Sequence, residues 1–189
     1  MQAAVALWRV HGFEGTTVTD ICKAAGVSKA LFYVYFSRKE DVLYAAEVFA
    51  MRDGHVAAGS VASGPYELVD VIAAVIRNLE TQARQYPAEL IFEAVIENYR
   101  LERRAVADGA ADAALTFLFL EPFEQAQRDG KLAATVSVTQ AARLAQTLVS
   151  DGIRRWAAVG NLERRLADEL APEIADVLHG LSAHTLETL

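Results

Sequence analysis

Hydrophobic residues recur three and four positions apart along most of the 189-residue chain, which is the spacing of amphipathic α-helices. The four prolines and 11 glycines are few, which also favours helices. The clearest break is GSVASG at residues 59–64, where we expect a linker and a domain boundary near 55–64. The pattern predicts an all-α protein with about nine helices, over residues 2–11, 18–25, 29–36, 40–58, 66–86, 88–104, 110–128, 139–159 and 162–181.

The richest set of local signals lies in residues 16–43. Thr17 is a good N-cap, and Asp20 three residues later completes a capping box for the first short helix. Gly26 stands where a helix ends in the left-handed conformation, and Ser28 caps the next helix. Two short helices joined by a glycine-containing turn form a helix-turn-helix, whose second helix usually lies in the major groove of DNA.

The second of these helices carries a mixed outer face. If Phe32 and Phe36 point inward, the 100° step per residue places Lys29, Ala30, Tyr33 and Val34 on or near the outer side. A lysine and a tyrosine hydroxyl can bond phosphates or base edges, and small apolar side chains can touch thymine methyl groups. The alternative for Tyr33 and for Tyr35 is that each completes the core of a small domain.

Two further signals flank this unit. Val27, in the turn, is expected to insert into the core. Ser37 to Glu40 has the spacing of a second capping box, which we expect to open a helix from Glu40 to about Ala58. That helix would join the unit to the rest of the chain.

Four segments carry a resemblance to a known family: HGFEGTTV at 11–18, AGVSK at 25–29, YVYF at 33–36 and KED at 39–41. Together they resemble the N-terminal domain of TetR/AcrR-type transcriptional regulators. The resemblance implies a three-helix DNA-binding domain at residues 1–50 and a helical effector-binding and dimerisation domain at residues 51–189. We expect Lys29, Ala30 and Val34 at base edges. The full set of expected DNA-binding residues is Thr17, Thr19, Ser28, Lys29, Ala30, Tyr33, Val34, Tyr35 and Lys39.

The charge distribution fits this expectation better than the net charge of −7 does. Residues 1–39 carry five basic and two acidic side chains, whereas residues 40–189 carry 13 basic and 23 acidic ones. A mildly positive N-terminal region on an acidic body would turn that region toward phosphate. The lone Cys22 is expected to be a small core residue. With no disulfide pair, membrane span or signal peptide evident, we expect a cytoplasmic protein.

Two features of the C-terminal part suggest a ligand site. Asn98 falls opposite the polar stripe of helix 88–104, and a buried amide must find partners in another helix or in a ligand. Pro122 removes the donor for the Leu118 carbonyl and should kink its helix, where phenylalanines either fill the core or line a cavity. The candidate ligand-binding residues are Phe92, Val95, Asn98, Tyr99, Glu102, Phe117, Phe119 and Phe123.

Glutamates on two predicted helices are assigned to solvent-facing sides. Glu89, Glu93 and Glu97 are four residues apart, which could suit a metal but is more often a solvated face, with Glu97 near Arg100. Glu80 lies away from the apolar face of helix 66–86. The sequence therefore predicts no metal site here.

The last two predicted helices are amphipathic, and their small residues let a neighbouring helix approach closely. They could simply cover the body. The family resemblance implies instead that they pair with the same helices of a second chain in a four-helix interface. The residues expected at that interface are Leu144, Leu148, Gly152, Ile153, Trp156, Ile174, Val177, Leu178 and Leu181.

No catalytic constellation is evident, because the four histidines are scattered and the chain lacks HExxH, GxSxG, P-loop and GxGxxG patterns. We expect no enzyme activity, metal or cofactor. The resemblance implies a homodimeric repressor that binds a palindromic DNA operator and responds to a small, mostly apolar effector. Paired domains are needed because one short helix makes few contacts. The alternatives are an enzyme with an apolar active site, and a helical small-molecule binding protein whose N-terminal domain no longer binds DNA.

Overall fold

The structure, a computed structural model, describes residues 1–107, 109, 117–159 and 165–186. The all-α prediction is confirmed. The predicted helical segments 110–116 and 162–164 lie outside the described residues, as does the side chain of Phe117. The helices of the described part are α1 (Gln2–His11), α2 (Val18–Ala25), α3 (Lys29–Tyr35), α4 (Glu40–Val61), α5 (Leu68–Ala83), α6 (Ala88–Ala107), α7 (Phe117–Arg128), α8 (Val138–Ala158) and α9 (Leu166–Leu186).

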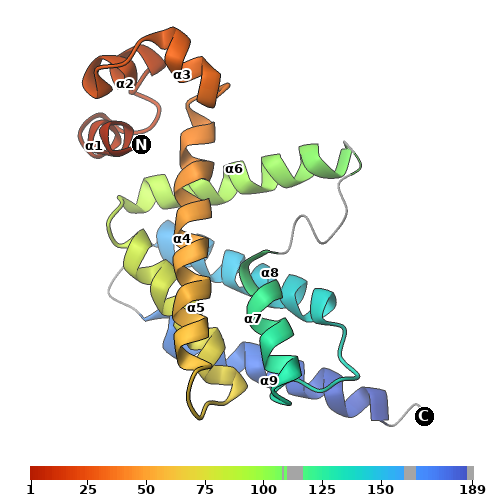
Figure 1. The fold of residues 1–189 in the computed structure, drawn as a ribbon. Helices are drawn as coiled ribbons and strands as arrows, with labels where there is room; N and C mark the ends of the chain where they lie inside the picture. The colour runs from red at the N-terminus through yellow and green to blue at the C-terminus, as the bar shows by residue number, and fades with distance from the viewer. Residues whose placement is uncertain (108, 110–116, 160–164, 187–189) are drawn as a thin grey trace.

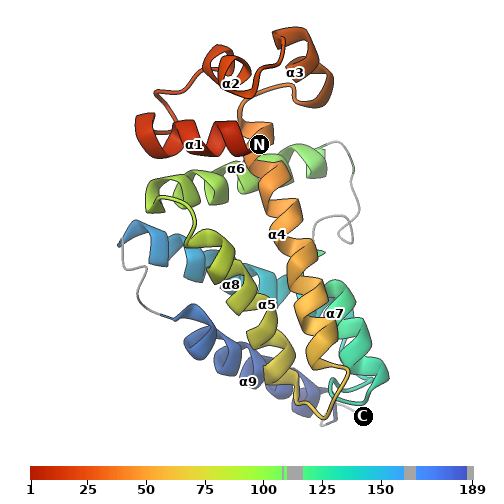
Figure 2. The same ribbon diagram turned by 60° about the vertical axis from the view of Figure 1, so that its left-hand side comes forward.

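Helices α1–α3 form a small unit at one end of the molecule, which we call the head (Figure 1). Helices α5–α9 form the larger part of the molecule, which we call the body. Helix α4 leaves the head and packs against α5, α6 and α7 of the body. In both views α6 crosses between the head and the rest of the body (Figure 2). No helix in the described part of the chain is long and apolar enough to cross a membrane.

The head has a small core of its own. The rings of Trp8 and Phe13 lie with their centroids 5.3 Å apart, and Cys22 is buried beside them as predicted. One member, Leu90, comes from α6, so a body residue closes the core of the head. The buried members are Ala4, Trp8, Phe13, Ile21, Cys22, Phe32, Val42, Leu43 and Leu90.

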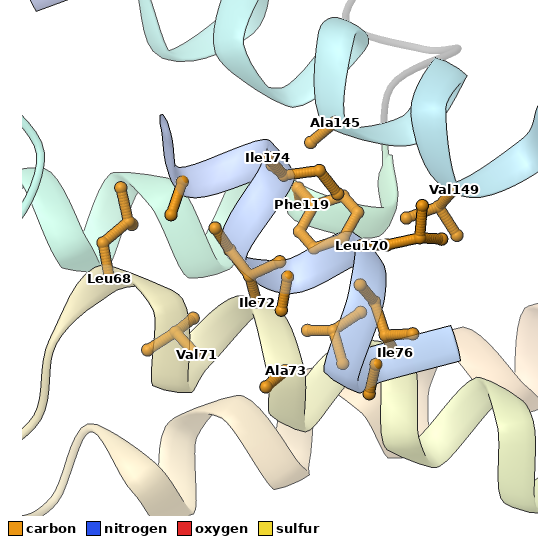
Figure 3. Close-up of a cluster of buried hydrophobic side chains, with 14 of the residues drawn as sticks. Leu68, Val71, Ile72, Ala73, Ile76, Phe119, Ala145, Val149, Leu170 and Ile174 are labelled. Carbon is orange, nitrogen blue, oxygen red and sulfur yellow. The ribbon is translucent and has the colours of Figure 1, made fainter. Parts of the chain in front are cut away.

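The body is built around a larger apolar core between α5, α7, α8 and α9. Figure 3 shows side chains from all four helices gathered in it, among them Ile72 of α5, Phe119 of α7, Ala145 of α8 and Ile174 of α9. Burying a large apolar side chain completely contributes about 1.5–3 kcal/mol. This core is therefore the main source of stability in the body.

Four residues expected at a dimer interface lie in this core. Gly152, Trp156, Ile174 and Leu178 are buried within the single chain. Gly152 lets α8 approach α9 of the same chain, because a Cβ here would lie 2.5 Å from Cδ1 of Leu170. Packing within one chain thus accounts for the burial of these four, since helical periodicity identifies an apolar face but not the helix that covers it. Their place at a dimer interface stays a prediction.

The carbonyl that Pro122 leaves without a helical partner finds one on α4. Pro122 lies inside α7 and has no N–H to donate to the Leu118 oxygen. His55 Nε2 lies 3.1 Å from that oxygen, and His55 Nδ1 lies 3.2 Å from the Glu121 carboxylate. The missing helical bond is thus replaced by a contact that ties α4 to α7.

Helix α4 is longer than predicted. It continues through Gly59 to Val61, so the expected linker at 59–64 begins inside the helix. Ala58 belongs to the body core. The C-terminal end of α4 therefore packs against the body.

The start of α4 also differs from the prediction. The expected capping box from Ser37 to Glu40 is absent. Lys39 is the N-cap residue, and its side chain does not cap the helix. The Asp41 carboxylate instead accepts hydrogen bonds from the backbone N–H groups of Ser37 and Arg38, at 2.8 and 3.0 Å. The carboxylate that closes this turn lies one residue later than the pattern indicated.

Glu80 of α5 is buried, contrary to the solvent-facing prediction. It is 6% exposed, and its carboxylate accepts hydrogen bonds from the backbone N–H groups of Leu166 and Ala167 at 2.9 and 3.4 Å. These amides open α9, and the first amides of a helix have no partner inside it. Arg84 lies 3.2 Å from the same carboxylate. Glu80 therefore joins α5 to the N-terminus of α9.

Candidate DNA-binding surface

The helix-turn-helix forms through the local signals that the sequence predicts. Thr17 Oγ1 accepts from the Asp20 N–H at 3.2 Å, and the Asp20 carboxylate accepts from the Thr17 N–H at 3.0 Å. The Thr17 hydroxyl, then its backbone amide, hold the pKa of the Asp20 carboxyl below its usual value. Gly26 ends α2 with φ 66°, and Ser28 Oγ accepts from the Leu31 N–H at 3.1 Å. These caps are confirmed.

Helix α3 presents a row of exposed side chains. Tyr33 is 55% exposed, Val34 74% and Tyr35 73%, so neither tyrosine completes the core of the head. Phe32 turns inward and lies 5.4 Å from the Phe36 ring. Lys29 and Ala30 are exposed beside these residues. The outer face thus combines an ammonium group, phenol hydroxyls and small apolar groups, which suit phosphates and base edges.

This surface also contains two apolar residues that the sequence pattern does not predict there. Val27, expected in the core, is 36% exposed in the turn, and Leu31 is 45% exposed on α3. Thr19 is also exposed, whereas the exposed hydroxyls of Thr17 and Ser28 already take part in helix caps. The apolar pair was missed because an apolar side chain in a small domain is usually assigned to the core.

Lys39 is already engaged inside the head. Its ammonium donates to the carbonyl oxygens of Phe13 and Thr16 at 2.8 and 3.4 Å, and it lies 4.3 Å from the centroid of the Phe13 ring. These contacts tie the start of α4 to the loop after α1. An ammonium group has three donors, so one is left for DNA. Lys39 is therefore a structural residue of the head as well as a candidate for phosphate contact.

Besides α4, contacts from α1, from α6 and from the segment after α3 join the head to the body. Arg9 of α1 donates to the backbone carbonyl of Gln85. Leu90 of α6 enters the head core, and Glu97 of α6 accepts a hydrogen bond from Arg38 at 2.6 Å. Leu90 and Glu97 are seven residues apart, which places them on one side of α6. That side of α6 faces the head.

Glu97 is enclosed by three arginines. It is 3% exposed, and its carboxylate lies 2.6 Å from Arg38, 2.9 Å from Arg104 and 3.3 Å from Arg100. Burial alone raises the pKa of the Glu97 carboxyl, but hydrogen bonds from Arg104, Arg38 and Arg100 outweigh it and hold the pKa below its usual value. The solvent-facing prediction is wrong for Glu97, although its proximity to Arg100 is confirmed.

The predicted ligand-binding residues of α6 are divided between two sides of the helix. Asn98, Tyr99 and Glu102 are exposed, so the predicted burial of Asn98 is wrong. Glu97 takes the inward position instead, because the head packs on that side. Phe92 and Val95 face inward, with Phe92 packed against the body core.

The phenylalanines of α7 lie apart from that exposed side. Phe119 and Phe123 are fully buried in the body core, with ring centroids 5.2 Å apart. The structure thus places the predicted ligand-binding residues partly in the body core and partly on an exposed side of α6. Within the described residues, no group of three or more His, Cys, Asp and Glu side chains is placed to hold a metal.

Residues 1–46 match the family described as bacterial regulatory proteins, tetR family. The matched range contains α1, α2, α3 and the start of α4, which build the exposed surface. By this match, the head resembles the bacterial regulatory proteins of the tetR family. No curated protein matches the chain by sequence.

Similarity to solved structures extends beyond the head to the body. FadR of Thermus thermophilus, a TetR family transcriptional repressor in complex with lauroyl-CoA, is 26% identical, with a TM-score of 0.64 over 94% of this chain and 90% of that chain. FadR of Bacillus subtilis, in complex with stearoyl-CoA, is 18% identical, with a TM-score of 0.59 over 94% of each chain. FadR of Bacillus halodurans is 20% identical, with a TM-score of 0.58 over 94% and 91% of the two chains. The two Bacillus proteins support the fold alone.

Proposed function

We propose that this protein is a TetR-type transcriptional repressor that binds a palindromic DNA operator as a homodimer. The observation that carries the proposal is the outer face of α3, where Tyr33, Val34 and Tyr35 are more than half exposed beside Lys29. Neighbouring exposed apolar side chains usually mark a surface that a partner covers. The repressor role is supported by the description of the T. thermophilus relative.

Within this proposal, residues 1–50 are the DNA-binding domain and residues 51–189 the effector-binding and dimerisation domain. Lys29, Ala30 and Val34 contact base edges, since they lie on the exposed face of α3. Tyr33 and Tyr35 position the helix on phosphates through their hydroxyl groups. Val27 and Leu31 add apolar contacts at the start of the same helix.

The dimer is proposed because two half-sites on DNA require two heads. The candidate interface keeps those predicted residues of α8 and α9 that are not fully buried within the chain. Val177 is 41% exposed, and the others are partly exposed. The revised set is Leu144, Leu148, Ile153, Val177 and Leu181.

The effector we propose is a long acyl chain carried by coenzyme A. The support is the T. thermophilus relative, which was solved with lauroyl-CoA. The apolar and aromatic interior of the body suits an acyl chain. Release of DNA requires that the effector bind the DNA-free arrangement of the dimer more tightly than the DNA-bound one.

Selection from a pool of random DNA duplexes with the purified full-length protein tests the DNA-binding part. We expect enrichment of an inverted repeat whose half-sites lie one helical turn, about 10 base pairs, or a multiple apart. Binding to the selected duplex should weaken steeply with salt, because lysine and arginine contacts release counterions. Failure to enrich any sequence would contradict the proposal and favour a binding protein whose head no longer binds DNA.

Titration of the protein–DNA complex with lauroyl-CoA tests the effector class. We expect the complex to dissociate with lauroyl-CoA and to persist with coenzyme A alone, which lacks the acyl chain. Equal persistence with both compounds would contradict the proposed effector while leaving DNA binding intact.

A further inference from the structure

The buried carboxylate of Glu97 has partners on two different helices. Arg100 and Arg104 follow Glu97 on α6, three and seven residues later, so their bonds stay within one helix. Arg38 lies outside α6, 59 residues earlier in the chain, and makes the shortest of the three contacts at 2.6 Å. The Arg38–Glu97 contact alone among these three therefore connects α6 to the segment that follows α3.

Arg38 is well placed to transmit this contact to the DNA-binding surface. It lies three residues after Tyr35, the last residue of α3, and two residues before α4 begins. Its backbone N–H donates to the Asp41 carboxylate at 3.0 Å, which fixes the turn. Since its backbone N–H and its guanidinium are both held, Arg38 connects the segment after α3 to α6.

We propose that Glu97 is a positioning residue that fixes the orientation of the head on the body and thereby sets the spacing of the two heads for DNA. The consequence for DNA rests on the proposed function, whereas the orientation itself does not. Glu97 does not contact DNA in this proposal. It acts through Arg38, while Leu90 on the same side of α6 supplies an apolar contact to the head.

The chemistry favours a directional contact over a loose one. Glu97 is 3% exposed, so its carboxylate cannot turn to water and is held by guanidinium donors of fixed geometry. The Arg38 side chain is 40% exposed, so it can return to water when the carboxylate is removed. Loss of Glu97 should therefore free the head without leaving an unpaired charge buried.

The test measures the distance between head and body by double electron–electron resonance in the full-length protein. Spin labels go on Ala24→Cys in α2 and Glu124→Cys in α7, since both side chains are exposed and the native Cys22 is buried. Labelled protein is diluted with unlabelled protein, so that only distances within one chain contribute. We expect one narrow distance distribution in the otherwise native protein.

Glu97→Gln and Arg38→Gln should each broaden that distribution. The double variant should broaden it no further, because each change removes the same Arg38–Glu97 contact. Arg104→Gln is the matched control: it removes a bond to the same carboxylate, at 2.9 Å, but within α6. We expect the control to keep the narrow distribution. An unchanged distribution in Glu97→Gln, or equal broadening in Arg104→Gln, would overturn the proposal.

A second readout separates positioning from DNA contact. With the selected operator duplex, Glu97→Gln should lower affinity about tenfold, because the paired arrangement becomes a smaller fraction of the ensemble. Affinity for a duplex with a single half-site should change less than twofold, since the α3 surface is intact. Equal losses on both duplexes would overturn the positioning role. If the unaltered protein binds neither duplex, the proposed function fails, and the distance measurement still decides the orientation.

Discussion

Glu80 and Glu97 are both buried glutamates that the helical pattern placed on solvent-facing sides, yet they join different regions in different ways. Glu80 lies within the body and accepts hydrogen bonds from two backbone amides of α9, next to the large apolar core. Glu97 lies between body and head and is held by three arginine side chains that are 40–56% exposed.

The two glutamates therefore differ in what their loss leaves behind. Backbone amides at a helix N-terminus cannot turn away, so loss of Glu80 leaves them buried and unpaired. Arginine side chains can turn to water, so loss of Glu97 releases a contact at small cost. A stiff body with an adjustable head is the arrangement that a ligand-responsive DNA-binding protein requires.

The largest effect is expected for Glu80→Ala, which should lower the free energy of unfolding of the body by about 3 kcal/mol. Glu97→Ala, the matched change at the head, should lower the free energy of unfolding of the head by about 1 kcal/mol or less. Urea unfolding followed by fluorescence in Trp8→Phe and Trp156→Phe backgrounds can separate the two regions, because Trp8 lies in the head core and Trp156 in the body core. Equal losses of unfolding free energy in Glu80→Ala and Glu97→Ala would contradict the proposed difference between the two glutamates.

A smaller effect is expected for Gly152→Ala, which tests the packing of α8 against α9. The added methyl group would lie 2.5 Å from Cδ1 of Leu170, so the helices must shift, at a cost of about 2 kcal/mol. Gly59→Ala is the control, since nothing lies within 4 Å of a Cβ there. A loss of dimer affinity in sedimentation, with unchanged unfolding, would instead place Gly152 at a dimer interface.

The smallest effect concerns pH. The pKa of the Glu97 carboxyl is held below its usual value of 4.5, so its contribution to stability is present above that pH and is lost as the pH falls through the lower, folded-state pKa. The difference in head stability between the unaltered protein and Glu97→Gln, followed by Trp8 fluorescence, should stay constant from neutral pH down to about 4.5. A difference that disappears above this pH would contradict the three-arginine environment.

The head could be predicted closely because its structure depends on local signals. The Thr17–Asp20 capping box, the left-handed Gly26 and the Ser28 cap all involve residues three or fewer positions apart, or a single residue. The exposed face of α3 followed from the inward direction of Phe32. The start of α4 was not predicted, because Asp41 rather than Glu40 accepts the hydrogen bonds of the turn. The exposure of Val27 and Leu31 was not predicted either.

The body could be predicted as helices but not as contacts. Periodicity gave the apolar face of α8, yet it could not show that α9 of the same chain covers Gly152. The inward position of Glu97, rather than Asn98, depends on Arg38, which is 59 residues away in sequence. Such pairs carry no local signal. A glutamate three or four residues from an arginine on a helix has the same sequence pattern whether it is exposed or buried.

Paired tyrosine variants can decide whether the exposed face of α3 reads DNA. Tyr33 is 55% exposed on α3 and Tyr99 is 46% exposed on α6, so Tyr33→Ala and Tyr99→Ala remove similar surface from different regions. The measurement is a fluorescence anisotropy titration of the selected duplex with each variant, with no effector added. We predict that Tyr33→Ala weakens binding about tenfold while Tyr99→Ala binds like the unaltered protein. Normal binding by Tyr33→Ala would show that this face of α3 does not read DNA.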